Sequence, residues 1–262
     1  MKVYLIGAGC GPETLTRESC RALAAASLIV GAGRLLRSLP ADCIHSGARR
    51  VEAVAPREIL KEIERTGGES ACVLLSGDSG FYSGAKRLLP LLADHAVTVL
   101  PGISSLQLLS ARLGRPWQDW SLCSAHGVDC DPVEAVCGGK PCFFLTGGRV
   151  GPEELCARLR DAGLGALPVT VGENLGEPEE QICSGSAAEF AQRQFSPLSV
   201  LFTEAAPRFP RRSPGLPDTL FQREEKIPMT KQEVRAAALS RLAVGPEDLC
   251  WDSGAGTGSV SV

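Results

Sequence analysis

Long apolar runs are missing from this sequence, and none approaches the roughly 20 residues that a membrane-spanning helix needs. It also lacks a basic excess, since 27 lysines and arginines stand against 30 aspartates and glutamates, for a formal net charge of −3. A chain without a basic field has no electrostatic reason to condense on nucleic acid or on anionic lipid. We therefore expect a cytoplasmic protein that binds no nucleic acid and no membrane, and whose partner is a small molecule.

Metal-binding patterns are scarce as well. The chain has three histidines and no C-x-x-C pair, so no metal is expected, although the spacing of Cys123, Cys130 and Cys137 leaves a site open. Eleven cysteines occur with no secretory signal evident before them. We expect reduced thiols that fill the core, as opposed to disulfides. Those placed in apolar strands or helices are Cys72, Cys142, Cys156 and Cys250.

Short apolar runs alternate with helical patterns over the first part of the chain. Such alternation predicts an α/β lobe with a mostly parallel sheet covered on both faces. The helix expected over 15–26 has an apolar face made of Leu15, Cys20, Leu23 and Ala24. Gly114-Arg115-Pro116 is a stop signal that ends this lobe, 1–114. The other expected elements are strands near 3–6, 28–30, 71–75 and 96–100, and helices near 56–65, 85–92 and 104–113.

A second α/β lobe is predicted over 115–205. Four prolines and three arginines between 206 and 217 then indicate a semi-rigid linker, taken as 206–228. The last segment, 229–262, opens with a capping-box pattern from Thr230 to Glu233, which predicts a helix to about Leu242 and then a strand near 248–251. The elements expected in the second lobe are strands near 120–123, 142–145, 168–171, 181–183 and 198–202, and helices near 152–162 and 187–192.

The first strand leads into a glycine-rich loop, Gly7-Ala8-Gly9-Cys10-Gly11-Pro12. Small residues between a strand and a helix let a ligand approach the backbone, although a tight turn without a ligand would use them too. A dinucleotide fingerprint is excluded because Pro12 replaces a required glycine and Val30-Gly31 stands where an acidic residue should end the second strand.

Two further loops follow expected strands, at the sheet edge where ligands bind in α/β folds. One runs from Ser76 to Gly84, and its Asp78 is a candidate ligand contact or, equally, a turn or helix-cap residue. The other, Pro101-Gly102-Ile103-Ser104-Ser105, places two hydroxyls at a helix start, where an N-cap alone would also explain them.

In their order and spacing, these three loops resemble the tetrapyrrole methylase family, over residues 1 to about 205. Within the family, the glycine-arginine stretch Gly31–Leu36 and the form of the second loop are similar to the precorrin C5-methyltransferase branch, the CbiE type. The segment after the linker resembles the start of a CbiT-type C15-methyltransferase and decarboxylase, a Rossmann-like methyltransferase that is fused to the CbiE type in CobL. Further motifs that carry the resemblance are Ser124–Gly127, Phe144–Gly148, Gly172–Gly176, Pro228–Lys231, and Trp251-Asp252 with Gly254, Gly256 and Gly258.

The resemblance implies a tetrapyrrole methylase fold with a cofactor cleft between two lobes, S-adenosyl-L-methionine as cofactor, and a homodimer. The substrate implied is a tetrapyrrole, precorrin or cobalt-precorrin, whose carboxylates call for basic residues on the rim, with Arg34, Arg149 and Lys86 as candidates. His126 is a candidate proton acceptor, or a loop histidine with a purely structural role. The cofactor contacts implied are Gly9, Cys10, Asp78, Phe81, Ser104, Ser105, Leu145, Asn174 and Leu198. Cys10 departs from the proline common at this position.

The expected activity is methylation at C5 of precorrin-6Y or cobalt-precorrin-7 in cobalamin biosynthesis. The residues leave two alternatives open: a methylase of the same fold acting on another tetrapyrrole position or another substrate, and a non-catalytic remnant of a bifunctional enzyme. We expect the CbiT-like segment to be a truncated, incomplete Rossmann-like piece, because one helix, one strand and a turn cannot close a second cofactor site.

Overall fold

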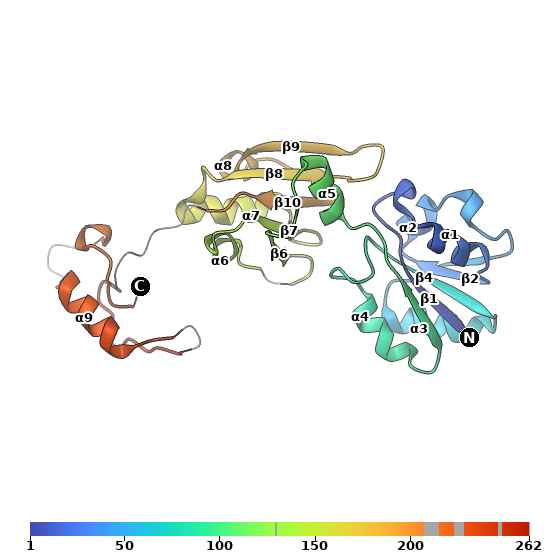
Figure 1. Cartoon of the computed structure of the whole chain (residues 1–262), viewed down its shortest axis with the longest axis horizontal. Coiled ribbons are helices and arrows are strands. Elements are labelled where there is room, and N and C mark those ends of the chain that lie inside the picture. The colour runs from blue at the N-terminus through green and yellow to red at the C-terminus, as the bar shows by residue number, and fades with distance from the viewer. Residues whose placement is uncertain (129, 207–214, 223–227, 246–247, 262) are drawn as a thin grey trace. The chain divides into compact units, whose positions relative to one another are not determined.

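The computed structural model describes residues 1–128, 130–206, 215–222, 228–245 and 248–261. It divides the chain into two compact units, Met1–Pro207 and Arg208–Val262. The first unit contains two five-stranded sheets (Figure 1). Much of the linker predicted over 206–228 lies outside the described residues.

The first sheet is entirely parallel, in the order β3-β2-β4-β1-β5. Alternate residues of its central strands enter opposite cores, so Val3 and Leu5 pack with α3 and α4, while Ile6 packs with α1 and α2. Helices therefore cover both faces, as predicted (Figure 1). The elements are β1 (Lys2–Gly7), α1 (Arg17–Ala24), β2 (Leu28–Gly31), α2 (Gly33–Ser38), β3 (Arg49–Glu52), α3 (Pro56–Thr66), β4 (Ser70–Leu75), α4 (Ala85–Leu88) and β5 (Ala96–Leu100).

Three details of this lobe differ from the sequence prediction. Helix α1 buries Leu23 as predicted, but its other buried residues are Ser19 and Ala22, whereas Cys20 is half-buried and Ala24 exposed. The helix expected over 85–92 is α4 followed by a 3-10 turn, Leu89–Leu92, since the proline within that turn cannot donate an α-helical hydrogen bond. The short elements α2 and β3 had not been predicted.

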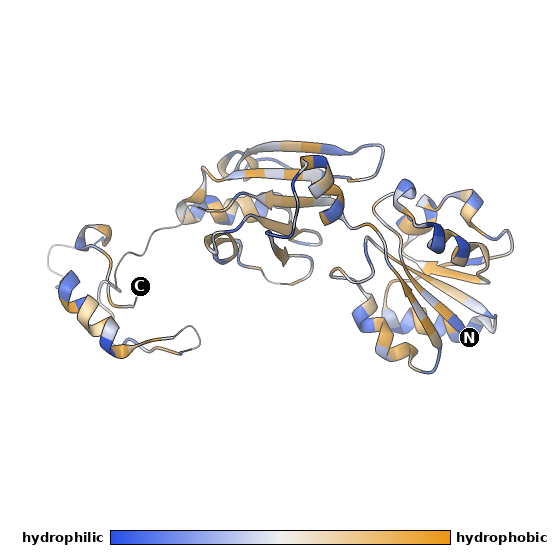
Figure 2. Ribbon diagram, viewed as in Figure 1, coloured by the Kyte–Doolittle hydropathy of each residue, from blue (hydrophilic) through white to orange (hydrophobic). Residues whose placement is uncertain are grey.

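The second sheet, in the order β6-β7-β10-β8-β9, is mixed: β6 and β7 pair in parallel and the other neighbours are antiparallel. Its strands are β6 (Ser121–Ser124), β7 (Cys142–Leu145), β8 (Pro168–Glu173), β9 (Gln181–Ser186) and β10 (Ser199–Thr203). Helix α5 (Ser105–Leu113) packs on one face. The other face is covered by α6 (Pro132–Cys137), α7 (Pro152–Leu159) and α8 (Ala187–Phe190). The strands of both sheets are rich in hydrophobic residues (Figure 2).

The second unit is small, and its core contains a charged residue. Arg235 of α9 (Gln232–Leu242) is fully buried, donates to the carbonyl oxygens of Thr230 and Leu216, and forms a 2.8 Å ion pair with Asp218. Its guanidinium lies 4.8 Å from the centre of the Phe221 ring. An Asp218–Leu220 3-10 turn completes the described elements of this unit.

Three expectations for this unit are wrong. The helix cap is Lys231, without a side-chain hydrogen bond, so the capping box from Thr230 does not form. No strand occurs at 248–251 among the described residues, and Leu249 and Trp251 are 100% and 94% exposed. A strand needs a neighbour to satisfy its backbone, and the described part of this unit offers none. Cys250, expected in the core, is exposed, whereas Cys72, Cys142 and Cys156 are buried and all eleven thiols are free.

Candidate active site

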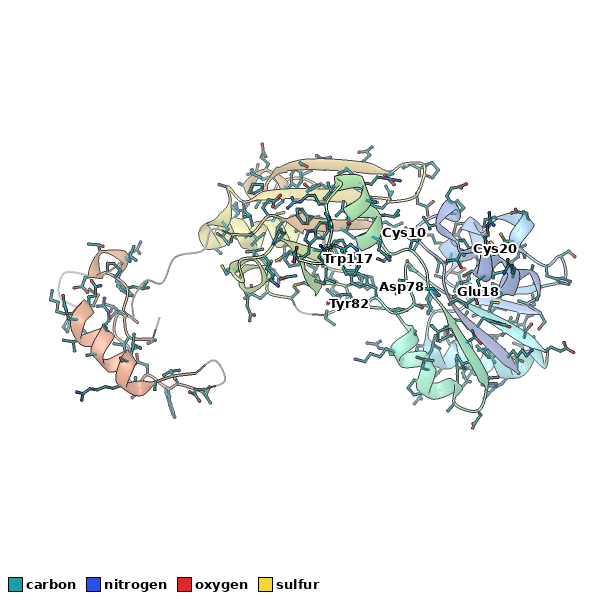
Figure 3. The ribbon with its side chains drawn as sticks, in the orientation of Figure 1. Cys10, Glu18, Cys20, Asp78, Tyr82 and Trp117 are labelled. Atoms are coloured by element: carbon teal, nitrogen blue, oxygen red, sulfur yellow. The ribbon has the colours of Figure 1, made fainter. Side chains whose placement is uncertain are left out.

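A cavity of about 490 Å³ lies within the first unit and is lined from both lobes. Its walls come mainly from the loops that follow β1, β4 and β5 of the first sheet and β7 and β8 of the second. The predicted residues that line it are Cys10, Asp78, Phe81, Ser104, Ser105, His126, Leu145, Asn174, Leu198 and Arg34. Gly9, Lys86 and Arg149 do not line it. Figure 3 labels three of the lining residues, Cys10, Asp78 and Tyr82.

Glycines bring the three loops of the first lobe into backbone contact. Gly9 and Gly77 exchange backbone hydrogen bonds of 3.0 and 2.9 Å. A Cβ on Gly7 would lie 2.6 Å from the Gly102 nitrogen, and one on Gly102 would lie 2.4 Å from the Gly77 oxygen. Both distances are shorter than a carbon side chain allows, so the loops can meet in this way because no side chain is present.

Thr14 holds the first loop in shape. Its hydroxyl oxygen accepts from the backbone nitrogens of Cys10 and Gly11, at 2.9 and 3.1 Å, and donates to the Gly11 carbonyl at 2.6 Å. Gly9 has a φ of +74°, and a Cβ there would lie 2.0 Å from this hydroxyl. The sequence analysis missed Thr14, although a threonine that follows a glycine loop is a recognisable turn residue. Gly9 thus shapes the loop without lining the cavity.

Asp78 joins the second loop to the third. Its Oδ1 accepts from the Gly80 nitrogen at 2.8 Å, and its Oδ2 accepts from the Gly102 nitrogen at 3.0 Å. The turn role that the sequence left open for this carboxylate is therefore present. Since a carboxylate can accept about four hydrogen bonds, Asp78 keeps acceptor capacity at the cavity wall.

Ser104 is the N-cap of α5 and is almost fully buried. Its hydroxyl accepts from the Gln107 nitrogen at 3.4 Å, while the Gln107 side chain accepts from the Ser104 nitrogen at 2.6 Å. This is the capping arrangement that the sequence offered as one explanation. Ser105 lies half-buried at the first position of the helix and also lines the cavity.

In the second lobe, Asn174 has an unusual backbone, with a φ of +50°. Its nitrogen donates to the Leu198 carbonyl at 2.7 Å, and its Oδ1 accepts from the Ser196 hydroxyl at 2.8 Å. Asparagine adopts this left-handed region more readily than most residues, and these two hydrogen bonds hold it there. The bond between residues 174 and 198 joins two segments that line the cavity.

His126 is exposed and follows the end of β6. Its Nδ1 lies 3.4 Å from the Thr146 carbonyl oxygen. A carbonyl oxygen can only accept, so this contact requires a proton on Nδ1 and leaves the Nε2 lone pair available in the neutral ring. A Cβ on Gly147 would lie 2.2 Å from the same Nδ1, so the glycine makes room for the ring.

Several contacts fasten the two lobes together beside the cavity. The Tyr82 hydroxyl donates to the Leu122 carbonyl at 3.0 Å, and Tyr82 has a φ of +46°. A Cβ on Gly11 would lie 1.9 Å from the Gly176 oxygen, so those two loops touch through their backbones. Tyr82 lines the cavity, although the sequence analysis gave it no role.

An ion pair secures the loop that follows β8. Arg112 of α5 donates to Glu180 at 2.6 Å, and Glu180 accepts from the Gly176 nitrogen at 2.7 Å. The hydrogen bond from Arg112 is the main cause that lowers the pKa of the Glu180 carboxyl below its usual value, with a smaller contribution from Gly176.

Burial, more than the nearby charges, sets the state of the Cys10 thiol. Burial raises the pKa of this thiol to about 11, an effect that the nearby Arg34 opposes and Glu177 reinforces. The Sγ donates to the Ile103 carbonyl at 3.4 Å. Cys10 is therefore a protonated thiol at neutral pH, and it links the first and third loops.

Among the described residues, no group of three or more histidine, cysteine or acidic side chains has an arrangement suited to a metal ion. Over the same part of the chain, no helix has the length and apolar character to cross a membrane.

Comparison with known proteins identifies relatives over both units. The profile of the Tetrapyrrole (Corrin/Porphyrin) Methylases matches residues 2–191, and that of a Precorrin methyltransferase domain matches residues 219–262. The Precorrin-6Y C(5,15)-methyltransferase [decarboxylating] of Sinorhizobium sp is 34% identical over 257 residues, which is 96% of this chain and 61% of that protein. The chain therefore spans less than two thirds of the length of this relative.

Two shorter relatives match parts of the chain. The Cobalt-precorrin-7 C(5)-methyltransferase of Salmonella typhimurium is 30% identical over 179 residues, covering 68% of this chain and 87% of that protein. The Probable cobalt-precorrin-6B C(15)-methyltransferase (decarboxylating) of Saccharolobus solfataricus is 57% identical over 49 residues, covering 19% of this chain and 25% of that protein.

Solved structures show the same fold. The Precorrin-6Y Methylase (cbiE) of Archaeoglobus fulgidus superposes with a TM-score of 0.62 at 23% identity, over 79% of this chain and 99% of that one. The Uroporphyrin-III C-methyl transferase of Thermus thermophilus, complexed with S-adenyl homocysteine, gives 0.62 at 22% identity, over 78% and 97%. Since the family profile matches most of the residues that build the two sheets and the cavity, this chain belongs to the tetrapyrrole methylase family.

Proposed function

We propose that the chain is an S-adenosylmethionine-dependent methyltransferase that methylates C5 of a corrin precursor, precorrin-6Y or cobalt-precorrin-7. The observation that carries the proposal is the convergence of eight of the nine implied cofactor contacts on one cavity, from loops far apart in the sequence. The C(5)-methyltransferase relative, of which the chain covers 87%, supports the position on the ring.

The cavity suits an adenosine-containing cofactor. A volume of about 490 Å³ is in the range of small-molecule sites, which combine apolar walls with a few fixed polar groups. Phe81, Leu145 and Leu198 supply apolar wall, while Asp78 and Ser105 supply polar groups. Because the glycine-rich loops are held by their own hydrogen bonds, the site is formed before a ligand enters.

S-adenosylmethionine supplies an electrophilic methyl group when bound. The residues of the chain contribute position: a rigid site can account for about 7–11 kcal/mol of the barrier by orienting two reactants. Asp78, Ser104 and Asn174 are each fixed by hydrogen bonds to their surroundings, which prepares them for this task. An electron-rich ring carbon needs no strong base to make it a nucleophile.

A proton must leave the tetrapyrrole after its carbon has gained a methyl group. We assign His126 as the acceptor, because the Thr146 carbonyl fixes the proton on Nδ1 and leaves Nε2 free in the cavity wall. The proton would move to Nε2 and then to solvent, to which this side chain is exposed.

The experiment is incubation of the purified chain with isotopically labelled S-adenosylmethionine and cobalt-precorrin-7, or precorrin-6Y, followed by carbon-13 spectroscopy of the product. We expect label at C5. Label at another ring carbon would assign a different methylase activity. Tight cofactor binding without label in any corrinoid would support the non-catalytic alternative. The homodimer expected from the family is a separate proposal, which analytical ultracentrifugation tests.

A further inference from the structure

Part of the cavity wall is formed by residues that are not among the proposed cofactor contacts. Those contacts come from the loops after β1, β4, β5 and β8, from the end of β7 and from Leu198 just before β10. A separate stretch of wall comes from residues after β2 and β3: Ala32, Arg34, Leu35, Ala53, Val54, Pro56 and Ile59. A methyltransferase holds two reactants, so this wall is available to the second one.

Arg34 is the single arginine or lysine among the described residues that line the cavity. It belongs to α2, and its side chain is 37% exposed. Its Nη2 donates to the Ser76 hydroxyl at 3.1 Å, and its Nη1 lies 3.9 Å from Glu177 Oε1. The guanidinium therefore stands between the β4 loop of one lobe and the β8 loop of the other.

Most of the hydrogen-bonding capacity of Arg34 is unused by these contacts. A guanidinium has five N–H donors, and one of them is committed to Ser76. The 3.9 Å contact with Glu177 is too long for a hydrogen bond. Because Arg34 and Glu177 are only partly buried and their charged atoms lie 3.9 Å apart, their ion pair is weak, and a new anion can replace Glu177 at small cost.

We propose that Arg34 binds a side-chain carboxylate of the tetrapyrrole substrate, and that Glu177 competes for the same guanidinium. The inference rests on the proposed function in one respect, which is that the substrate carries acetate and propionate side chains. Arginine suits this role because its planar fork matches a carboxylate through two parallel hydrogen bonds.

The proposal predicts opposite effects at two neighbouring residues. Removing the Arg34 charge should weaken binding of a carboxylated corrin, while removing the Glu177 charge should strengthen it. A purely structural clasp between the lobes would instead make both substitutions harmful, because each would break the same contact. The sign of the Glu177 effect therefore separates the two explanations.

The test measures binding of dicyanocobyrinic acid, a corrin with free peripheral carboxylates, by absorbance titration with saturating S-adenosylhomocysteine. Arg34→Gln should raise its Kd by about tenfold or more, the loss expected for a charge-assisted carboxylate contact. Glu177→Gln should lower it by about two- to fivefold, and the gain should vanish in the Arg34→Gln background.

Three controls accompany this test. Arg37→Gln removes a charge from the same helix at an exposed position outside the described cavity lining and should leave the Kd unchanged. Dicyanocobinamide, whose side chains are amides, should bind all variants with similar affinity. S-adenosylhomocysteine titrations of each variant confirm that the cofactor site is intact.

The outcomes separate this inference from the proposed function. Binding that is independent of Arg34, or a Glu177→Gln protein that binds more weakly, overturns the inference even if the parent protein methylates C5. Failure of the parent to bind cobyrinic acid overturns it as well. The parent protein could instead bind the corrin in a way that depends on the Arg34 charge and yet add no methyl group. That outcome would support the inference and overturn the proposed function.

Discussion

Residues that looked like ligand contacts in the sequence often also hold the loops of the site together. Asp78 bonds two backbone nitrogens, Ser104 caps a helix, and Asn174 braces the segment that contains Leu198. Each nonetheless lines the cavity. At the scale of the residue, structural and binding roles are therefore not alternatives, since fixing a side chain is what prepares it for a ligand.

We expect Asp78→Ala to lower the free energy of unfolding by about 1–3 kcal/mol, because the Gly80 and Gly102 nitrogens lose their acceptor. Binding of S-adenosylhomocysteine should weaken too, since the second and third loops are no longer tied. Urea unfolding and calorimetric titration measure the two effects. Ser79→Ala, at the buried neighbour, is the matched control and should cost less in both. Equal losses in the two variants would refute a special role for the carboxylate.

We expect His126→Asn to lower kcat by about 100-fold or more, in line with the loss of a general base, while KM and cofactor affinity change little. Asparagine can still donate to the Thr146 carbonyl but offers no basic nitrogen. Steady-state kinetics with the corrin precursor decide this. A raised KM with unchanged kcat would show that His126 lines the substrate site without accepting a proton.

The sequence could indicate the site residues that belong to glycine-rich loops, because such loops have a recognisable spacing. No hydrophobic periodicity marks Thr14 or Tyr82, and of the two only Thr14 has a local cue, its place just after a glycine loop. Thr14 acts through three hydrogen bonds to backbone atoms, and Tyr82 acts through one bond to a carbonyl of the other lobe. Neither residue is part of a periodic pattern. Because each bonds to backbone atoms, which every amino acid carries, no particular partner residue in the sequence reveals it either.

At the scale of the element, apolar segments were predictable even where they are short, as β2 and β7 show, whereas an exposed, charged strand was not. Strands β1 and β4 are apolar runs and were recognised. Strand β3, Arg49–Glu52, is an edge strand with largely exposed side chains, so it has no hydrophobic pattern. The antiparallel pairing of β8, β9 and β10 was also invisible, because strand direction depends on tertiary contacts that single segments do not encode.

The contact between the first loop and the β8 loop should not tolerate a side chain. Gly11 has extended backbone angles open to any residue, so Gly11→Ala adds no backbone strain. Its Cβ would lie 1.9 Å from the Gly176 oxygen, and the two loops must separate. We expect a loss of about 1–3 kcal/mol in unfolding free energy and weaker S-adenosylhomocysteine binding.

Gly84→Ala is the control for this substitution, because its Cβ would meet its nearest atom at an ordinary 3.6 Å although the residue lines the same cavity. Thermal unfolding and calorimetry compare the two variants. A Gly11→Ala protein as stable and as active in binding as Gly84→Ala would show that the loops can part without cost.

The ion pair between α5 and the β8 loop should make stability depend on pH. The pKa of Glu180 is lowered in the folded state, chiefly by the hydrogen bond from Arg112. The ionised Glu180 carboxylate therefore contributes to the free energy of unfolding at pH values above its ordinary pKa of 4.5, and this contribution is lost as the pH falls through the lowered pKa of the folded state. We expect Glu180→Gln to reduce the free energy of unfolding at pH 7. On acidification to about pH 3, the variant should lose less unfolding free energy than the parent protein.

Urea unfolding at both pH values measures the Glu180 effect. The neighbouring Glu179→Gln serves as control, since no ion pair to Glu179 occurs among the described residues. Parallel pH curves for parent and Glu180→Gln would show that the Arg112 contact does not stabilise the fold.

At the scale of the whole molecule, the two units differ in how well they bury apolar surface. The first has four clusters of buried hydrophobic residues around its two sheets. In the second, the described residues Leu242, Leu249 and Trp251 are more than half exposed, and a buried arginine takes a central place. The glycines at 254, 256 and 258 all have positive φ, and the described residues of this unit include no strand that could support this turn.

This difference predicts the product made by a protein of these 262 residues. The C(5)-methyltransferase relative is covered over 87% of its length, whereas the decarboxylating C(15)-methyltransferase relative is covered over 25%. One complete cavity lies among the described residues of the first unit, and the described part of the second unit has no strand to support another. We therefore expect one cofactor equivalent bound per chain, one methyl group added and no carbon dioxide released. Calorimetry counts the cofactor, and mass spectrometry of the product counts the methyl groups. A gain of two methyl groups with loss of a carboxylate would show that the second unit is catalytic in this chain, despite the absence of a sheet from its described residues.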